Sequence, residues 1–126
     1  MKGLLLTGAA LLLILIATAG VWLYLTDSAE QVCQELDGLE EAIMSEDWSR
    51  AEEVCRRAEE AWEQVRPRWA MLIDHEEMED IDFAYVSLKG AIRREDRDEA
   101  TADLTELVFF LRHAPEAERP GWENIL

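Results

Sequence analysis

The densest cluster of chemically active side chains is residues 74–82, with the sequence DHEEMEDID. His75, Glu79 and Asp82 follow one another at spacings of four and three, which places them on one face of a helix. Imidazole and carboxylate groups are ligands that zinc accepts. If two antiparallel helices turn near residue 95, His113 approaches the level of His75 and would complete a set of His75, Glu79 and His113.

A simpler interpretation accounts for the same residues, and we adopt it. The sequence contains no H-E-x-x-H motif, and acidic residues in the first turn of a helix are favoured by the helix dipole. We therefore predict no metal site and no cofactor. The cluster is interpreted as capping and solvated charge.

The sequence also lacks a pattern typical of catalysis. A nucleophile needs a base within hydrogen-bonding distance, and Ser87 lies three turns from His75 on the same predicted helix. The six glycines are scattered and form no phosphate-binding loop. We predict that the protein is not an enzyme.

Residues 4–25 contain no charged side chain. At about 1.5 Å per residue this run is about 33 Å long, enough for a hydrocarbon core of about 30 Å. Trp22 and Tyr24 lie at its far end, where amphipathic aromatic rings favour the lipid headgroups. We predict a transmembrane anchor in residues 1–26 with a short cytoplasmic N-terminus.

The charges on either side of the anchor predict its direction. Lys2 and the amino terminus precede it, whereas Asp27, Glu30 and Glu35 follow it and no basic residue occurs before Arg50. Basic flanks stay in the cytoplasm. The anchor is thus a signal anchor in a cell membrane, and residues 27–126 form an extracytoplasmic domain.

A cleaved signal peptide is the alternative, because residues 17–19 form an A-x-A cleavage site. The apolar run continues to Leu25, longer than a signal peptide needs, which favours retention of the anchor. Cleavage after Ala19 stays open, and either way the domain is exported.

The exported domain is strongly acidic. All 28 acidic residues and all but one of the 12 basic residues follow Thr26, so this part carries a formal charge of −17. Such a field opposes nucleic acid and anionic lipid. We predict no nucleic-acid partner, and we interpret most of the charge as a solvated surface.

Four amphipathic helices are predicted in the domain. The first spans residues 28–45, begins with a capping box at Ser28 or continues directly from the anchor, and is followed by a second helix from Trp48. Pro67 ends or kinks that second helix. Two further helices lie on either side of a polar turn at residues 94–98. The predicted fold class is all-α: one N-terminal transmembrane helix followed by a four-helix bundle of two paired helical hairpins.

An internal repeat supports the hairpins. A shift of 49 residues aligns LxxAIxxEDxxxA at residues 39–51 with the same pattern at residues 88–100. We predict one helix–turn–helix used twice, with the aspartate capping the second helix and the last alanine at the close helix contact. The apolar tail, residues 120–126, is predicted to fold back onto the core.

Phe83, Val86 and Phe109 lie beside the main apolar stripes. They either widen the core or form a docking surface, and we assign them to an interaction surface.

Cys33 and Cys55 fall within about one turn of each other across the first predicted hairpin. We predict a disulfide between them, which would stabilise the domain by about 3 kcal/mol. Two buried free thiols are the alternative.

The sequence resembles a known family at three places: Trp69-x-x-Leu72-Ile73-Asp74-His75-Glu76-x-x-x-x-Ile81, residues 107–113 and the terminal Asn-Ile-Leu. It is similar to the uncharacterised bacterial family catalogued as domain of unknown function 4363. The resemblance implies an anchor followed by a helical domain, and it implies no activity.

These patterns together predict a membrane-anchored extracytoplasmic helical protein that acts as a protein-interaction or accessory module. Its partners are the lipid bilayer, through the N-terminal helix, and a protein of the membrane or envelope. The alternative is a metal- or ligand-sensing domain. The oligomeric state is left open.

Overall fold

The structure, a computed structural model, describes residues 1–118, and within them every regular element is helical. The predicted all-α class is confirmed. The tail predicted to fold onto the core lies outside the described residues. The elements in chain order are α1 (Lys2–Glu35), α2 (Leu39–Met44), α3 (Trp48–Leu72), α4 (His75–Arg93), α5 (Arg97–His113) and the 3-10 helix η1 (Ala114–Glu118).

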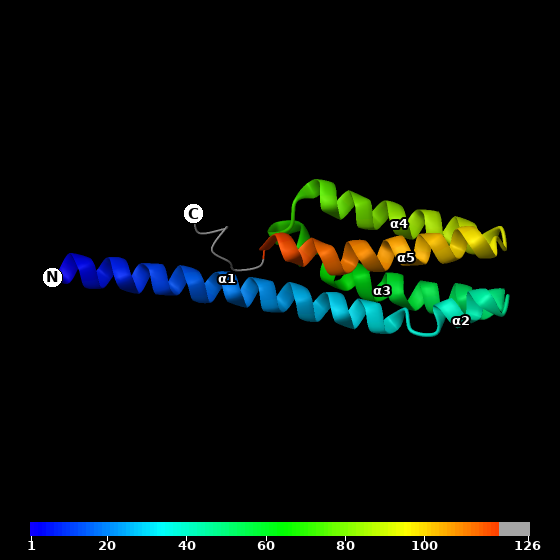
Figure 1. The fold of residues 1–126 in the computed structure, drawn as a ribbon, viewed down its shortest axis with the longest axis horizontal. Helices are drawn as coiled ribbons and strands as arrows, with labels where there is room; N and C mark the ends of the chain where they lie inside the picture. The colour runs from blue at the N-terminus through cyan, green and yellow to red at the C-terminus, as the bar shows by residue number, and fades with distance from the viewer. Residues whose placement is uncertain (119–126) are drawn as a thin grey trace.

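The long helix α1 has two different surroundings. Its first half projects alone, and its second half runs beside the other helices (Figure 1). By length and composition it is able to cross a membrane, and its most apolar window has no buried residue. Val21 is the first residue that packs on the core, and Leu25 is fully buried. The same helix therefore provides both the candidate span and one wall of the helical body.

No break separates these two parts of α1, so the continuous helix is the alternative that the structure adopts. Ser28, predicted as a possible helix cap, lies inside α1. Its hydroxyl donates to the carbonyl oxygen of Tyr24, as serine commonly does within a helix, at 2.8 Å. The same hydroxyl accepts a buried hydrogen bond from Trp69 Nε1 on α3, also at 2.8 Å. Ser28 thus fastens the long helix to the body.

The single helix predicted for residues 28–45 is wrong, because α1 ends at Glu35 and α2 begins at Leu39. Gly38, between them, has φ of 85°, a left-handed conformation that glycine adopts without steric cost. The chain turns there while Leu36 and Leu39 both stay buried. The buried apolar residues therefore keep a helical spacing across the turn at Gly38, which is why the sequence predicted one continuous helix.

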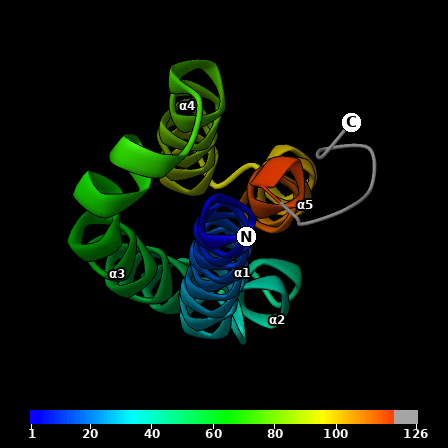
Figure 2. The same ribbon diagram turned by 90° about the vertical axis from the view of Figure 1, so that its left-hand side faces the viewer.

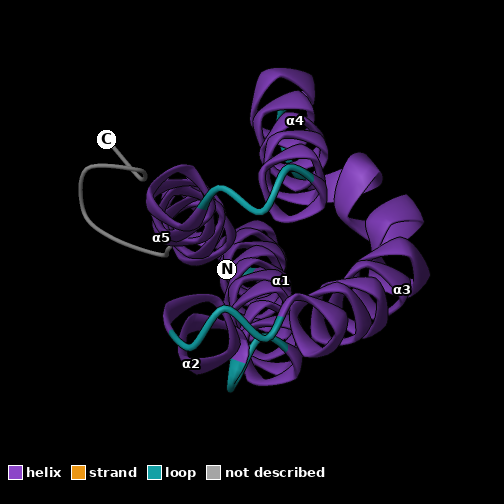
Figure 3. Ribbon diagram, turned by 90° about the vertical axis from the view of Figure 1, so that its right-hand side faces the viewer, coloured by secondary structure: helices purple, strands orange, loops and turns teal. Residues whose placement is uncertain are grey.

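The core lies where α3, α4 and α5 gather around the second half of α1, as the end views show (Figures 2 and 3). Its largest buried side chains include Trp62 and Trp69 on α3, Tyr85 on α4, Leu25 on α1 and Leu107 on α5. The two indoles meet edge to face, with centroids 5.1 Å apart and planes at 85°. This geometry is favoured by the aromatic quadrupoles.

Pro67 does not end α3, which continues to Leu72. Proline removes one backbone donor and crowds the preceding turn, so a helix that continues past it bends. The C-terminal turns of α3 bend toward the start of α4 in Figure 2. The sequence predicted that Pro67 either ends or kinks the helix, and the structure shows that the helix continues past it.

The internal repeat is reproduced in the backbone. Glu46 and Glu95, at equivalent positions, have φ of 57° and 56°, and they are the only described non-glycine residues with positive φ. At the next position, Asp47 and Asp96 each donate a backbone hydrogen bond of 2.9 Å to the carbonyl five residues earlier. This is the hydrogen-bond pattern of a Schellman helix end. Both turns lie at the end of the body far from the N-terminus (Figure 1).

The two aspartates also cap the helices that follow, as predicted. Oδ1 of Asp47 accepts from the backbone N–H of Arg50 at 3.3 Å, and Oδ1 of Asp96 accepts from that of Glu99 at 3.1 Å. The last alanine of each repeat is fully buried. The repeat is therefore a structural unit of turn, cap and close helix contact.

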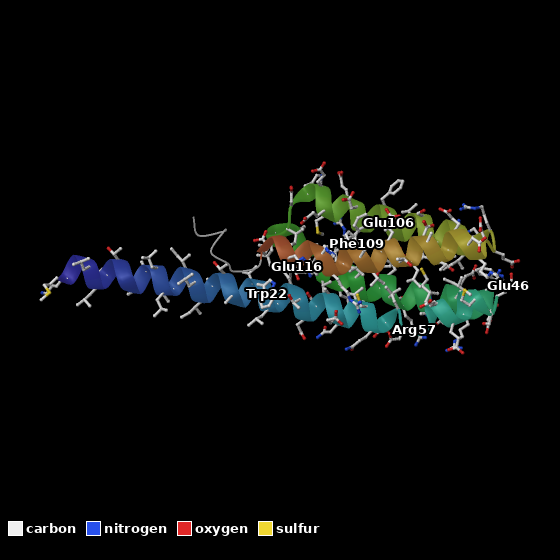
Figure 4. All side chains as sticks on the ribbon, viewed as in Figure 1. Trp22, Glu46, Arg57, Glu106, Phe109 and Glu116 are labelled. Atoms are coloured by element: carbon white, nitrogen blue, oxygen red, sulfur yellow. The ribbon has the colours of Figure 1, made fainter. Side chains whose placement is uncertain are left out.

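We expect Asp96→Ala to lower the free energy of unfolding by about 1 kcal/mol, because a backbone N–H of the first turn of α5 loses its acceptor. Asp47→Ala should cost a similar amount, since the two turns share one geometry. Chemical denaturation of the full chain in detergent micelles would measure both. Glu106→Ala, on the exposed side of α5 (Figure 4), is the control, and cap variants no less stable than this control would contradict the assignment.

Candidate interaction surface

The helical body exposes several large apolar side chains on α4 and α5. Phe83 is 74% exposed, Val86 61% and Phe109 52%. They are not part of the core that the described residues form. Their role in an interaction stays a prediction.

These side chains border two neighbouring hollows. Phe83 and Val86 line a shallow hollow on α4 together with acidic residues, and Phe109 lines a second hollow between α4 and α5 with His113. Asp80 borders both hollows. The apolar groups therefore belong to one continuous region, which we call the α4–α5 face and define by Phe83, Val86, Phe109 and Asp80.

Two neighbours hold the ring of Phe109. His113 stacks on it with centroids 3.9 Å apart and planes at 20°. Phe110 meets it edge to face at 6.0 Å. Figure 4 shows Phe109 on the part of α5 nearer η1. A ring fixed in this way loses less side-chain entropy on binding than a free one.

The structure does not assemble the candidate metal ligands. His75 and Glu79 form a pair on the surface, with Nε2 and Oε1 2.9 Å apart. His113 is stacked on Phe109 instead, and its hollow contains Glu77 and Asp80 of α4. Within residues 1–118, no three His, Cys, Asp or Glu side chains are grouped so that they could hold a metal ion.

Asp82, on the predicted face with His75 and Glu79, binds α3. It accepts from Trp62 Nε1 at 3.1 Å and from Arg66 Nε at 2.9 Å, and Arg66 Nη2 donates a second, shorter bond. Burial alone would raise the pKa of the Asp82 carboxyl, but the bonds from Arg66 and Trp62 outweigh it and lower that pKa. The carboxylate is therefore a structural link between α3 and α4.

Ser87 is also engaged in helix packing. Its hydroxyl donates to Asp103 Oδ2 on α5 at 2.9 Å, and Asp103 is itself buried. On the opposite side of α4, Lys89 pairs with Glu59 of α3 at 2.7 Å. Each polar pair connects α4 to a neighbouring helix, so these groups contribute to the placement of the helices.

Comparison with known proteins adds one match. The family described as Domain of unknown function (DUF4363) matches residues 20–125, most of the chain. The chain belongs to the DUF4363 family. No curated protein and no solved structure matches it. In this DUF4363 chain, the matched region begins where α1 starts to be covered by the body, at Val21.

The hydrogen bond between Trp69 and Ser28 was not predicted from the sequence, although the position of Ser28 indicated that it needs a partner. Ser28 lies four residues before Val32 and eight before Leu36, on the buried stripe of α1, and is only 3% exposed. A polar residue on a buried stripe needs a partner. The indole N–H of Trp69 is that partner, and in the sequence Trp69 was used only as part of the family pattern.

Trp22 and Tyr24, predicted to lie at the lipid headgroups, are partly covered by the helical body. Tyr24 packs against the core, and α1 as a whole contacts both α3 and η1. The indole nitrogen of Trp22 and the hydroxyl of Tyr24 are buried, with no hydrogen-bond partner among the described residues. The body therefore reaches the level at which the sequence placed the membrane surface.

Cys33 and Cys55 are both buried and both free in the structure. Burial raises the pKa of Cys33, and it raises the pKa of Cys55 to about 11. Burial raises the pKa of the Tyr85 hydroxyl, and the negative charges that Cys55, Cys33 and Glu59 would carry raise it further. Cys33 borders a hollow that α1 shares with α5, whereas Cys55 borders one between α3 and α4, and the disulfide stays a prediction.

The cysteine prediction has a direct test in protein taken from its native membrane. If Cys33 and Cys55 are oxidised there, denaturation and alkylation without reductant should add no alkyl group to the intact mass, and two after reduction. Cys33→Ala is the control, since it leaves one thiol that reacts in both conditions. Two added groups in unreduced native material would mean that the free thiols of the structure persist.

Proposed function

We propose that this DUF4363 protein is an extracytoplasmic accessory module, held at the membrane by α1, that binds another membrane or envelope protein through the α4–α5 face. The observation that carries the proposal is the exposure of Phe83, Val86 and Phe109, which line two hollows that share Asp80 and lie outside the core formed by the described residues. Exposed apolar groups surrounded by polar ones are typical of protein-binding surfaces.

The charge around the α4–α5 face indicates the kind of partner. Asp80 lies between the two hollows, and Glu79 and Glu77 border one hollow each. Burial and the neighbouring carboxylates raise the pKa of Glu77. A partner with apolar pockets and a basic rim would relieve this repulsion and cover the rings.

The structure of the body suits such a role. In the proposal, α2–α3 and α4–α5 act as two paired hairpins, and their repeated turns and polar pairs keep the α4–α5 face rigid. The ion pairs Arg66–Asp82 and Lys89–Glu59 join α3 to α4. A preorganised face binds with a smaller entropic cost.

Photo-crosslinking in intact cells tests the interaction. A benzoylphenylalanine placed at Phe83 of the full chain should give a discrete cross-linked protein, because the ring sits at the centre of the proposed contact. The matched control is the same amino acid at Arg57, which is exposed on α3. Equal or absent cross-linking at the two positions would contradict a partner on the α4–α5 face.

The proposed orientation rests on Lys2 before the span and on Asp27, Glu30 and Glu35 after it. We expect an alkaline phosphatase fused after Leu126 to be active and a fluorescent reporter that folds only in the cytoplasm to stay dark. Lys2→Glu combined with Asp27→Lys should weaken this preference. If only the cytoplasmic reporter is active, the orientation is the opposite of the one proposed.

A further inference from the structure

The length of α1 left uncovered sets the height of the helical body above the membrane. Among the described residues, Val21 is the first apolar residue that packs on the core. The charge-free residues from Gly3 to Gly20, at about 1.5 Å each, span about 27 Å. The hydrocarbon core of a bilayer is about 30 Å thick, and any tilt of the helix shortens its reach. The end of the body nearest the N-terminus therefore has no room to stand clear of the headgroup layer.

The C-terminal end of α3 forms part of this end of the body. The connection from α3 to α4 and the helix η1 lie nearest the N-terminus in Figure 1, at about the level of Trp22 in Figure 4. The Trp69–Ser28 hydrogen bond gives the register. Because helical side chains lean toward the N-terminus of their own helix, the backbone after Trp69 lies beyond Ser28, toward the span.

The side chains at this end are suited to a lipid surface. Met71 is 85% exposed, the highest value among the large apolar residues that the structure describes outside the span. Arg68 is also exposed. Residues 64–73 contain two arginines and no acidic residue, in a domain that is otherwise strongly acidic. Arg66, the other arginine, is paired with Asp82, which leaves Arg68 as the cation directed outward.

The start of α4 limits the kind of lipid. Asp74 and Glu76 follow the end of α3 closely and are exposed. Together with the charge of −17, they oppose a strongly anionic surface. A zwitterionic phospholipid offers a phosphate to Arg68 without a net negative field.

We propose that the end of α3, residues 68–72, lies in the headgroup layer of the phospholipid bilayer that α1 spans, with the Met71 side chain at the acyl boundary and Arg68 facing lipid phosphate. The inference rests on the membrane anchoring in the proposed function. It makes the bilayer a second contact surface of the helical body, separate from the α4–α5 face. With α1 and α3 both held, the body stands at a fixed height and does not swing on a linker.

Depth-dependent fluorescence quenching tests this contact. The full chain, with Cys33→Ala and Cys55→Ala, receives one environment-sensitive label at Met71→Cys and is reconstituted in phosphatidylcholine vesicles with or without lipids that carry a nitroxide near the headgroup. Circular dichroism checks that each variant keeps its helices. Met44→Cys is the matched control, because Met44 is an exposed methionine at the opposite end of the body. Leu12→Cys, in the middle of the span, reports on the anchor.

The expected result is a blue-shifted, strongly quenched label at position 71 and an unquenched label with water-like emission at position 44. Adding Arg68→Glu should reduce the quenching at 71. A label at position 12 deep in the bilayer would support the anchor. If the label at position 71 then shows the same quenching and emission as the label at position 44, the headgroup contact is wrong. If the label at 12 is itself in water, the anchoring is wrong.

Discussion

A buried hydrogen bond between Trp69 Nε1 and Ser28 Oγ joins the helix that carries the apolar span to the rest of the protein. Its net contribution is about 1 kcal/mol, but leaving the indole N–H unpaired in the core would cost about 1–3 kcal/mol. The bond therefore favours one register of α3 on α1. Every other helix is placed relative to that pair, since α4 packs on α3 and α5 on α4.

The placement continues through the two indoles of α3. Trp69 meets Trp62 edge to face, and Trp62 donates to Asp82 of α4. Arg66, one turn after Trp62, binds the same carboxylate. A line of packed and hydrogen-bonded groups thus runs from α1 to α4, and α4 carries Phe83 and Val86. The orientation of the exposed apolar side chains follows from contacts made in the core.

Local chemistry was predictable from the sequence, whereas relative placement was not. The two repeated turns were predicted because an aspartate cap and a small alanine act within a few residues. The break at Gly38 was missed because the buried positions before and after it keep helical spacing, and periodicity reports side-chain burial, not backbone continuity. His113 was expected near His75, but its neighbours depend on how α5 sits along α4, and Phe109 offered a stacking partner one turn away. Phe83, Val86 and Phe109 lie beside the apolar stripes in the sequence, which left a wider core and a docking surface both open; they are exposed in the structure, and their role in an interaction stays a prediction.

The uninterrupted course of α1 has a rotational consequence. Each residue of an α-helix advances the side chains by about 100° around the axis. No flexible joint separates the span from the body, because α1 is continuous. The number of residues between a lipid-facing side chain and Ser28 therefore determines the direction, around the axis of α1, in which the body faces. One residue inserted or deleted near Gly20 would turn Phe83 and Phe109 by about a quarter of a circle relative to anything that packs on the span. With α1 as the proposed anchor, the phase of the helix as well as its length would therefore decide which membrane neighbour the helical body faces.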